Sequence, residues 1–305
     1  MHAVVNFILI AICIIAGMLF KRAGIVPPDA HKGVNAFIIY LALPAVSFKY
    51  LPHIQWSREL LFAAAAPVIT WLCSWLYITV YSKSAGTDKA TSAGLKLTTG
   101  LCNTSFLGFP LITAYFGEHL LATAVICDQV SFILLSVAGI IVAVGASQTQ
   151  QLSAGLLLKR VLTFPPFLGC AGALLIPHFI NISPVSGLFD KLAGTVGPLA
   201  LFSIGLQLRF DGWREQIKGV SVSLLYKLLL APAFIMIIAF ILGLRGDVPK
   251  ISVFEMSMSG MLTTGVIADE YHLNPRLANL IVGIGIVACL ITSILWWYVV
   301  SHWLT

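Results

Sequence analysis

Long apolar runs recur along the whole sequence, and they constrain its fold more than any other feature. A helix needs about 20 mostly apolar residues to cross the hydrocarbon core of a bilayer. Dividing the chain at its charged, Gly/Pro and polar clusters leaves ten such runs, at residues 3–20, 33–52, 59–82, 93–116, 120–146, 155–179, 184–208, 219–243, 250–271 and 276–303. The sequence therefore predicts an all-α polytopic membrane protein with ten transmembrane helices.

The composition excludes several other classes of protein. Only 10 % of the 305 residues are charged and 59 % are hydrophobic, whereas a soluble domain carries about 25 % charged residues. Soluble enzymes, nucleic-acid binders and secreted disulfide scaffolds are therefore excluded. The six cysteines lie in apolar runs without CxxC spacing, so they are interpreted as small buried residues rather than metal ligands. The sequence has no HExxH, GxSxG or P-loop motif, so no enzyme, cofactor or metal site is predicted.

The distribution of Lys and Arg predicts the orientation in the membrane. With the ten spans above, twelve of the eighteen basic residues fall on one side and five on the other, and Lys227 lies inside a span. Cytoplasmic loops carry the excess of Lys and Arg. The first side is therefore predicted to be cytoplasmic and both termini to be outside, in a plasma membrane of bacterial inner-membrane type.

The two halves of the chain resemble each other. A shift of 156 residues aligns LITAYFGEHLLATAVI (111–126) with IADEYHLNPRLANLIV (267–282), and Pro44 has a counterpart in Pro198. These matches predict a five-helix repeat at 1–146, a short cytoplasmic linker at 147–154 and a second repeat at 155–305. Because each repeat has an odd number of spans, the second inserts upside down, as in many secondary transporters.

Polar, Gly and Pro residues interrupt the fourth and ninth spans at corresponding positions. The fourth is expected to unwind near 103–110, and the ninth carries SMSGMLTTG at 257–265. Unwound backbone at membrane depth lines a cavity or is buried in protein. Two matched interruptions favour a substrate site over ordinary kinks. The predicted binding residues are Asn103, Thr104, Ser105, Gly108, Pro110, Ser259, Gly260, Thr263, Thr264 and Gly265.

Four blocks resemble the auxin efflux carrier family, which includes plant auxin exporters and bacterial permeases for malonate and malate. They are LALPAVSF (41–48), NTSFLGFPL (103–111), PLALFSIGLQL (198–208) and IADEYHLN (267–274). The resemblance implies ten helices in two inverted repeats with crossed helices four and nine, a fold similar to that of bile acid/sodium symporters. Asn103 and Pro110 match the asparagine and crossover proline of the family's fourth-helix block. The proline common in the family's ninth helix is absent from Met256–Gly260.

Placing an ionisable or polar side chain inside a bilayer costs free energy, so each such residue requires a structural or functional explanation. Asp128, followed by Gln129, is interpreted either as a coupling or ligand-binding carboxylate or as a structural brace. Glu255 either carries a coupling proton or lies near the membrane surface. Lys227 is expected to extend to the cytoplasmic face, with pairing to a buried carboxylate as the alternative. Lys49 either caps helix carbonyls or attracts an organic anion.

Together these features predict a secondary carrier of small organic anions, mono- or dicarboxylates, that works by alternating access. The alternatives are a gradient-independent uniporter or channel-like protein, and a ligand-sensing membrane receptor that uses the carrier fold. The expected partners are the anion and the lipid bilayer, with a homodimer left open and no nucleic acid. The coupling ion, where there is one, is expected to be H⁺ or Na⁺.

Overall fold

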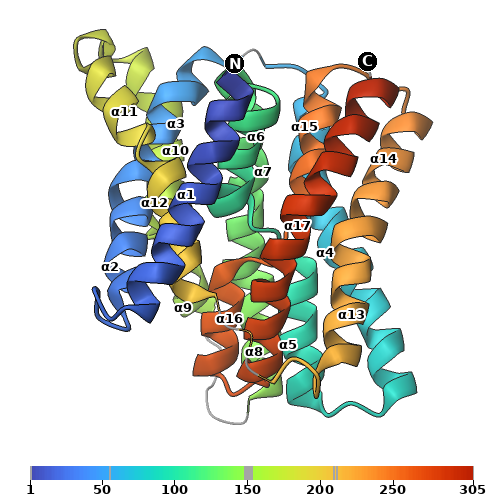
Figure 1. The fold of residues 1–305 in the computed structure, drawn as a ribbon. Helices are drawn as coiled ribbons and strands as arrows, with labels where there is room; N and C mark the ends of the chain where they lie inside the picture. The colour runs from blue at the N-terminus through green and yellow to red at the C-terminus, as the bar shows by residue number, and fades with distance from the viewer. Residues whose placement is uncertain (1, 55, 148–153, 209, 211, 305) are drawn as a thin grey trace. The chain divides into compact units, whose positions relative to one another are not determined.

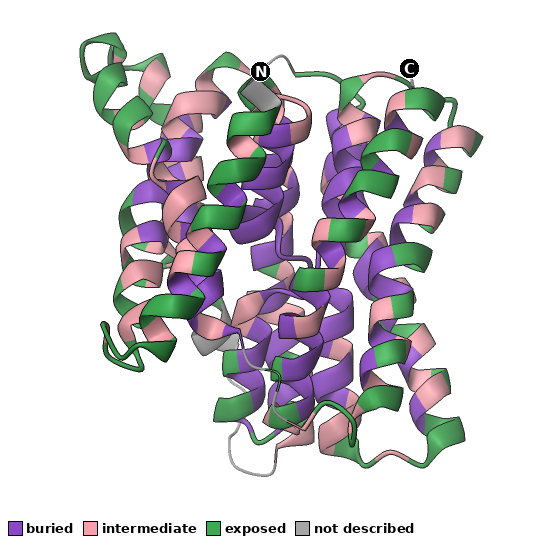
Figure 2. Cartoon of the chain, viewed as in Figure 1, coloured by how far each residue is buried: buried purple, intermediate pink, exposed green. Residues whose placement is uncertain are grey.

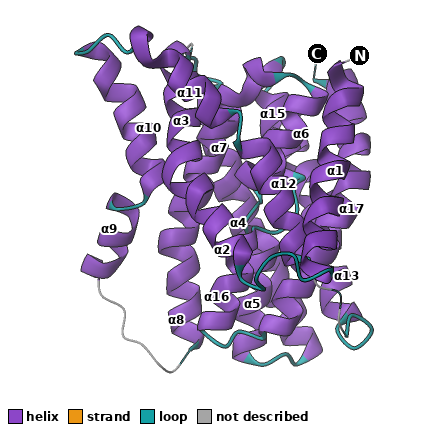
Figure 3. Cartoon of the chain, turned by 60° about the vertical axis from the view of Figure 1, so that its left-hand side comes forward, coloured by secondary structure: helices purple, strands orange, loops and turns teal. Residues whose placement is uncertain are grey.

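The structure is a computed structural model that describes residues 2–54, 56–147, 154–208, 210 and 212–304. Over these residues the chain is helical, with loops and turns and no strand (Figure 3). The predicted all-α class is therefore confirmed for this part of the chain. Backbone contacts divide the chain into two compact units, and each is described separately below.

Unit 1 comprises residues 1–56, 105–125 and 162–208. Its elements are α1 (His2–Arg22), α2 (Ala30–Phe37), η1 (Ile38–Ala42), α3 (Leu43–Tyr50), η2 (Leu51–His53), α6 (Phe109–Tyr115), η4 (Glu118–Leu120), α10 (Pro165–Leu175), η6 (Ile176–His178), η7 (Ser183–Val185), α11 (Ser186–Ala193) and α12 (Val196–Gln207) (Figure 1). Helix α1 packs against α12, and α3 packs against α10 and α11. Helices α1 and α12 approach closely, since a Cβ on Gly17 would lie 2.2 Å from the carbonyl oxygen of Phe202.

Unit 2 comprises residues 57–104, 126–161 and 209–305. Its elements are α4 (Leu60–Ala85), α5 (Lys89–Gly100), most of α7 (Leu121–Leu134), η5 (Leu135–Gly139), α8 (Ile140–Ala146), α9 (Ala154–Leu162), α13 (Ile217–Leu225), η8 (Tyr226–Leu230), α14 (Ala231–Ile241), α15 (Asp247–Met256), α16 (Leu262–Glu270) and α17 (Pro275–Trp303). Helix α5 contacts α4, α8, α13, α16 and α17. It is buried over most of its length (Figure 2).

Six helical stretches are long and apolar enough to cross a membrane. They are Val4–Arg22, Ala30–His53, Leu60–Ala85, Glu118–Ala146, Ile217–Ile241 and Pro275–Trp303. The other four predicted spans are each divided into two shorter helices, namely α5 and α6, α9 and α10, α11 and α12, and α15 and α16. Many large apolar side chains on the long helices are exposed, as a lipid-facing surface requires. The ten-span inverted repeat stays a prediction.

Three π-helical turns end two residues before a proline. The turns are η1, η8 and η3 (Thr104–Gly108), and the prolines are Pro44, Pro232 and Pro110. A proline has no amide hydrogen and its ring clashes with the carbonyl four residues earlier. Widening the preceding turn to an i→i+5 pattern relieves both problems without ending the helix. Gly108 and Pro110 are therefore helical, and the expected unwinding over 103–110 was wrong for this part of the segment.

The two compact units are a different division of the chain from the two predicted repeats. Each unit takes segments from both sequence halves, because the chain passes from one unit to the other after Trp56, Thr104, Val125, Val161 and Leu208. The repeats at 1–146 and 155–305 stay a prediction. Most of the predicted linker at 147–154, namely residues 148–153, lies outside the described residues.

Candidate functional site

Two interrupted helices of unit 2 pair at their breaks. Helix α5 ends at Gly100 and α15 ends at Met256, and the two extended segments that follow form an antiparallel bridge between Cys102 and Gly260. The Asn103 amide donates to the Ser259 carbonyl at 2.9 Å, and the Met261 amide donates to the Leu101 carbonyl at 3.0 Å. Each break thus supplies the backbone partners that the other lacks, as buried polar groups require.

Both breaks are shorter than the sequence predicts. The first spans residues 101–103, and the second lies between Met256 and Leu262. Thr263, Thr264 and Gly265 are helical, since α16 begins at Leu262. The Thr264 hydroxyl donates to the Met261 carbonyl at 2.6 Å and so is occupied within the chain. Three of the residues expected in the second break therefore form the first turn of the helix that follows.

Gly260 allows the two breaks to approach. A Cβ at this position would lie 2.5 Å from the Thr98 carbonyl oxygen, closer than real contacts allow. The neighbouring Ser259 is fully buried, and its carbonyl oxygen accepts the hydrogen bond from Asn103. We call the paired breaks, residues 101–103 and the segment between Met256 and Leu262, the crossing. The close approach at Gly260 explains how the crossing forms although the second break has no proline. A side chain on Gly260 would push α5 and the second break apart.

Asn103 carries an unused donor at the crossing. Its side chain is 2 % exposed, and its Nδ2 has no hydrogen-bond partner among the described residues. A buried amide without a partner is unfavourable by about 1–3 kcal/mol. Such a group needs an explanation, and a bound water or a ligand can supply the missing acceptor.

Asp128 is connected to the crossing through Thr104. The Thr104 hydroxyl donates to Asp128 Oδ1 at 2.5 Å, and Asp128 is 1 % exposed. Gln129, the next residue in α7, is also buried, and its Oε1 has no partner among the described residues. The structure thus brings together five of the predicted residues, which are Asn103, Thr104, Ser259, Gly260 and Asp128.

Lys227 and Glu255 lie in the same interior and are both fully buried. The Nζ of Lys227 contacts the Sγ of Cys102, the residue that pairs with Gly260. Glu255 interacts electrostatically with Asp128, Cys102 and Lys227. The expectation that Lys227 extends to the cytoplasmic face was therefore wrong. Glu255 is buried within the protein, and both interpretations of its role stay predictions. Sequence reasoning missed the part played by Cys102, because a cysteine in an apolar run carries no signal of a charged neighbour.

The crossing also presents the N-terminus of α16. The side chain of its N-cap, Met261, makes no cap hydrogen bond to the amides of the first helical turn, of which the Thr264 amide donates to the Met261 carbonyl at 3.0 Å. Helix N-termini carry partial positive charge and bind anions through these amides. The unpartnered Nδ2 of Asn103 in the paired break supplies a second donor, so the crossing can hold a carboxylate.

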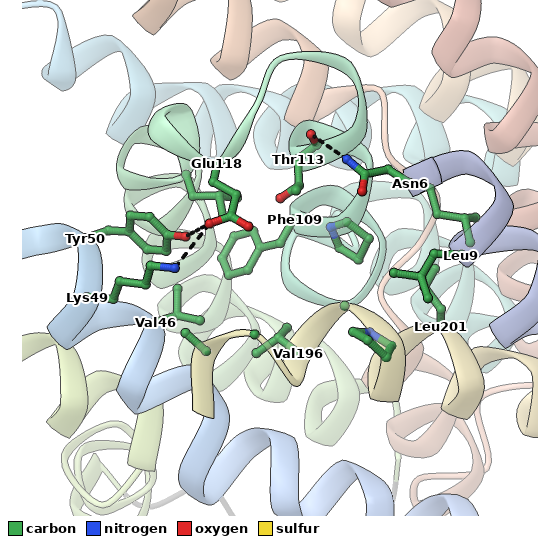
Figure 4. Close-up of a pocket in the computed structure, with 17 residues that line it drawn as sticks. Asn6, Leu9, Val46, Lys49, Tyr50, Phe109, Thr113, Glu118, Val196 and Leu201 are labelled. Atoms are coloured by element: carbon green, nitrogen blue, oxygen red, sulfur yellow. Dashed lines mark hydrogen bonds and ion pairs between the residues drawn. The ribbon is translucent and has the colours of Figure 1, made fainter. Parts of the chain in front are cut away.

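The remaining predicted residues belong to unit 1. Ser105 is buried, Gly108 is helical, and Pro110 and Lys49 line a cavity of 170 Å³ (Figure 4). Apolar side chains make up most of its wall, and its polar residues include Asn6, Tyr50, Thr113 and Glu118. Lys49 pairs with Glu118 at 3.2 Å and with Asp190 at 3.5 Å. Lys49 is thus neutralised by two carboxylates instead of being available to an anion. The sequence does not predict this cavity, because its polar residues are separated by up to 112 positions.

The comparisons with known proteins agree with these observations. The sequence matches the family model described as membrane transport protein over residues 1–159 and 162–297. It is 23 % identical over 294 residues to an "Uncharacterized transporter" of Methanothermobacter thermautotrophicus, covering 94 % of this chain and 95 % of the relative. An "Uncharacterized transporter" of Methanocaldococcus jannaschii is 23 % identical over 305 residues, with 97 % and 98 % covered.

A third relative has a substrate in its name. The "Putative malonate transporter" of Rhizobium meliloti is 25 % identical over 239 residues, which cover 75 % of this chain and 74 % of that protein. The resemblance to auxin efflux carriers found in the sequence motifs is confirmed at the level of the family.

Proposed function

The chain belongs to the membrane transport protein family, and from that premise we propose that it is a secondary carrier of small organic anions, mono- or dicarboxylates. The anion binds where the breaks after α5 and α15 pair, and alternating access moves it across the bilayer. The observation that carries this proposal is the buried, unpartnered Nδ2 of Asn103 at this crossing. The malonate in the name of one relative is a dicarboxylate and belongs to the same chemical class.

The chemistry of the crossing favours an anion over a cation as the main substrate. Asn103 Nδ2 is a donor, and the N-terminus of α16 adds backbone donors with partial positive charge. A hydrogen bond to a charged acceptor contributes about 1.5–3 kcal/mol. Two such groups bind a carboxylate without a buried arginine. In secondary transporters, half-helix N-termini point at anionic substrates in the same way.

The proposed orientation places both termini outside a bacterial inner membrane. It is supported by the excess of Lys and Arg in the loops assigned to the cytoplasmic side. Single cysteines introduced at His2 and His302 should react with a membrane-impermeant maleimide in intact cells, whereas a cysteine at Gln150 should react only after lysis. Labelling of His302→Cys only after lysis while His2→Cys reacts in intact cells would overturn the ten-span count, and labelling of both only after lysis would overturn the orientation.

The binding experiment compares Asn103→Ala with the wild type. Loss of one charge-assisted hydrogen bond should weaken carboxylate binding about tenfold to a hundredfold. Affinities for malonate, malate, acetate and pyruvate are measured by calorimetry on purified protein. Asn181→Ala is the matched control, because Asn181 is exposed and caps only a local turn through a 3.0 Å hydrogen bond from the Ser183 amide.

The same set of variants tells the proposal from its alternatives. Equal affinity in Asn103→Ala and the wild type would show that the anion binds elsewhere. Uptake into proteoliposomes with and without proton and sodium gradients then distinguishes a coupled carrier from a uniporter. Accumulation against a concentration gradient supports the carrier, and flux that only equalises the two sides supports the uniporter. Binding without any flux would favour a receptor.

A further inference from the structure

Three ionisable side chains share the interior of unit 2 next to the paired breaks. Lys227 and Glu255 are 0 % exposed and Asp128 is 1 % exposed. They come from η8, α15 and α7, so three separate elements converge on one place. Buried charged groups are normally paired or neutralised, because transfer out of water strongly disfavours the charged form. The charges in this cluster must therefore balance.

The partners within the cluster are unequal. Asp128 accepts a hydrogen bond from Thr104, and the Nζ of Lys227 contacts Cys102. Neither carboxyl oxygen of Glu255 has a hydrogen-bond partner among the described residues. If all three groups were ionised, the cluster would hold two negative charges and one positive charge. One added proton makes the cluster neutral. Glu255 is the group whose ionised form is least stabilised, because its carboxyl oxygens have no hydrogen-bond partner among the described residues.

We propose that Glu255 is a proton-binding site, and that its proton is the coupling ion that accompanies the transported anion. The charges of Asp128 and Lys227 then balance within the same cluster. The ionisable groups that interact electrostatically with Glu255 are Asp128, Cys127, Cys102, Lys227 and Cys289. Three other helices pack against α15. Helix α14 carries no ionisable residue, α4 carries Cys73, Tyr77, Tyr81 and Lys83, and α17 carries Arg276, Tyr298 and His302 besides Cys289.

The position of the cluster gives the reason for coupling. Asn103, which binds the anion in the proposed function, directly precedes Thr104, the donor to Asp128. An anion at Asn103 therefore adds negative charge beside two carboxyl groups, and this favours a proton on Glu255. By linkage, the proton strengthens anion binding by the same factor. The expected result is symport of an anion with a proton.

A proton fits the cluster better than a sodium ion. The Lys227 ammonium group already occupies the side of the cluster at Cys102, and it would repel a metal cation. A protonated Glu255 needs neither an open coordination sphere nor further ligands.

The first experiment needs no substrate, so its result is independent of the proposed function. Infrared spectra of purified protein at neutral pH should show the carbonyl stretch of a protonated carboxylic acid. Glu255→Gln should remove this band, and Glu255→Asp, which keeps a titratable carboxyl group, should retain one. Glu118→Gln is the matched control, since Glu118 is 61 % exposed and paired with Lys49. A band that persists in Glu255→Gln, or that is absent from the wild type, overturns the proton site.

The second experiment tests the coupling and does rest on the proposed function. At a pH high enough to remove the infrared band from the substrate-free protein, malonate added to the wild type in weak buffer should cause uptake of about one proton per bound anion, read from a pH indicator. Glu255→Gln should bind malonate without proton uptake and exchange it across proteoliposomes, but it should lose accumulation driven by a pH gradient. Malonate binding by the wild type without proton uptake overturns the coupling. A wild type that binds no malonate counts against the proposed function, and the infrared result still decides the proton site.

Discussion

Two clusters of one lysine and two carboxylates lie in different surroundings, one in each unit. In unit 1, Lys49 pairs with Glu118 and Asp190, and the three side chains are 23 %, 61 % and 57 % exposed. In unit 2, Lys227 lies with Glu255 and Asp128, and all three are buried. Water and salt can compensate the extra negative charge of the first cluster, whereas only a proton or a bound cation can compensate that of the second. The same residue types thus make a surface ion network in one place and a candidate coupling site in the other.

The partners of the two clusters differ in the same direction. Glu118 receives hydrogen bonds from Lys49 and from the Tyr50 hydroxyl, each at 3.2 Å. Glu255 receives none among the described residues. An exposed carboxylate loses little without partners because water replaces them, so its partners say little about function. A buried carboxylate without partners destabilises the fold. A functional role is therefore the simplest reason for its presence.

The largest expected effect comes from removing each lysine in turn. Lys227→Met leaves buried carboxylates without their cation and should lower the free energy of unfolding by about 3–5 kcal/mol. Lys49→Met should cost less than about 1 kcal/mol, because its cluster is largely in water. Chemical unfolding of the purified variants in detergent measures both. Similar decreases in the free energy of unfolding for the two variants would contradict the distinction between the clusters.

The second prediction concerns space instead of charge. Gly260→Ala should cost about 1–3 kcal/mol, because the added Cβ would lie 2.5 Å from the Thr98 carbonyl oxygen in the last turn of α5. Gly33→Ala is the control, since Gly33 lies within α2 and a Cβ there meets nothing within 4 Å. That change should be neutral or stabilising by up to about 1 kcal/mol. Thermal unfolding of both variants tests whether the crossing is as tightly packed as its geometry indicates, and equal stability would contradict it.

The sequence predicted the continuous helices better than the broken ones. Apolar length alone locates the six long spans, because a bilayer requires it. The division between α9 and α10 was missed, although Phe164 precedes Pro165 and has the extended ψ of 118° that such positions favour. A proline in an apolar run fits either a kink or a new helix start, and local sequence does not separate the two. The π-helical turns before Pro44 and Pro232 are examples of the first outcome.

The candidate site could be predicted as a list of residues but not as a set of contacts. Polar residues in apolar runs identified Asn103, Asp128, Glu255 and Lys227, since each is costly in a membrane. Their relation was not predictable, because Lys227 contacts Cys102 across 125 positions of sequence. The same limit led to the wrong placement of Lys227. A long basic side chain near a span end reaches water by default, and only tertiary packing decides otherwise.

The smallest expected effect concerns a carboxylate in water at the other end of α5. Asp88 is the N-cap of this helix, and its Oδ1 accepts a hydrogen bond from the Thr91 amide at 2.9 Å. Hydrogen bonds from the side chain and the amide of Thr91 lower the pKa of Asp88. A carboxyl group with a lower pKa in the folded state stabilises the fold above its unfolded pKa, and this stability is lost as the pH falls through the folded pKa.

Asp88→Ala should therefore cost about 1 kcal/mol at neutral pH, and the difference from the wild type should shrink on acidification. Asp88→Asn keeps a capping oxygen, so it should retain most of the stability while removing the part that depends on pH. Unfolding in detergent is measured across the acidic range for both variants and for Glu255→Gln. If Glu255 already holds its proton at neutral pH, Glu255→Gln leaves the acid-induced loss of stability unchanged. A loss that vanishes in Glu255→Gln but not in Asp88→Asn would assign the acid response to the buried cluster and reverse the contrast drawn between charges in water and charges in the interior.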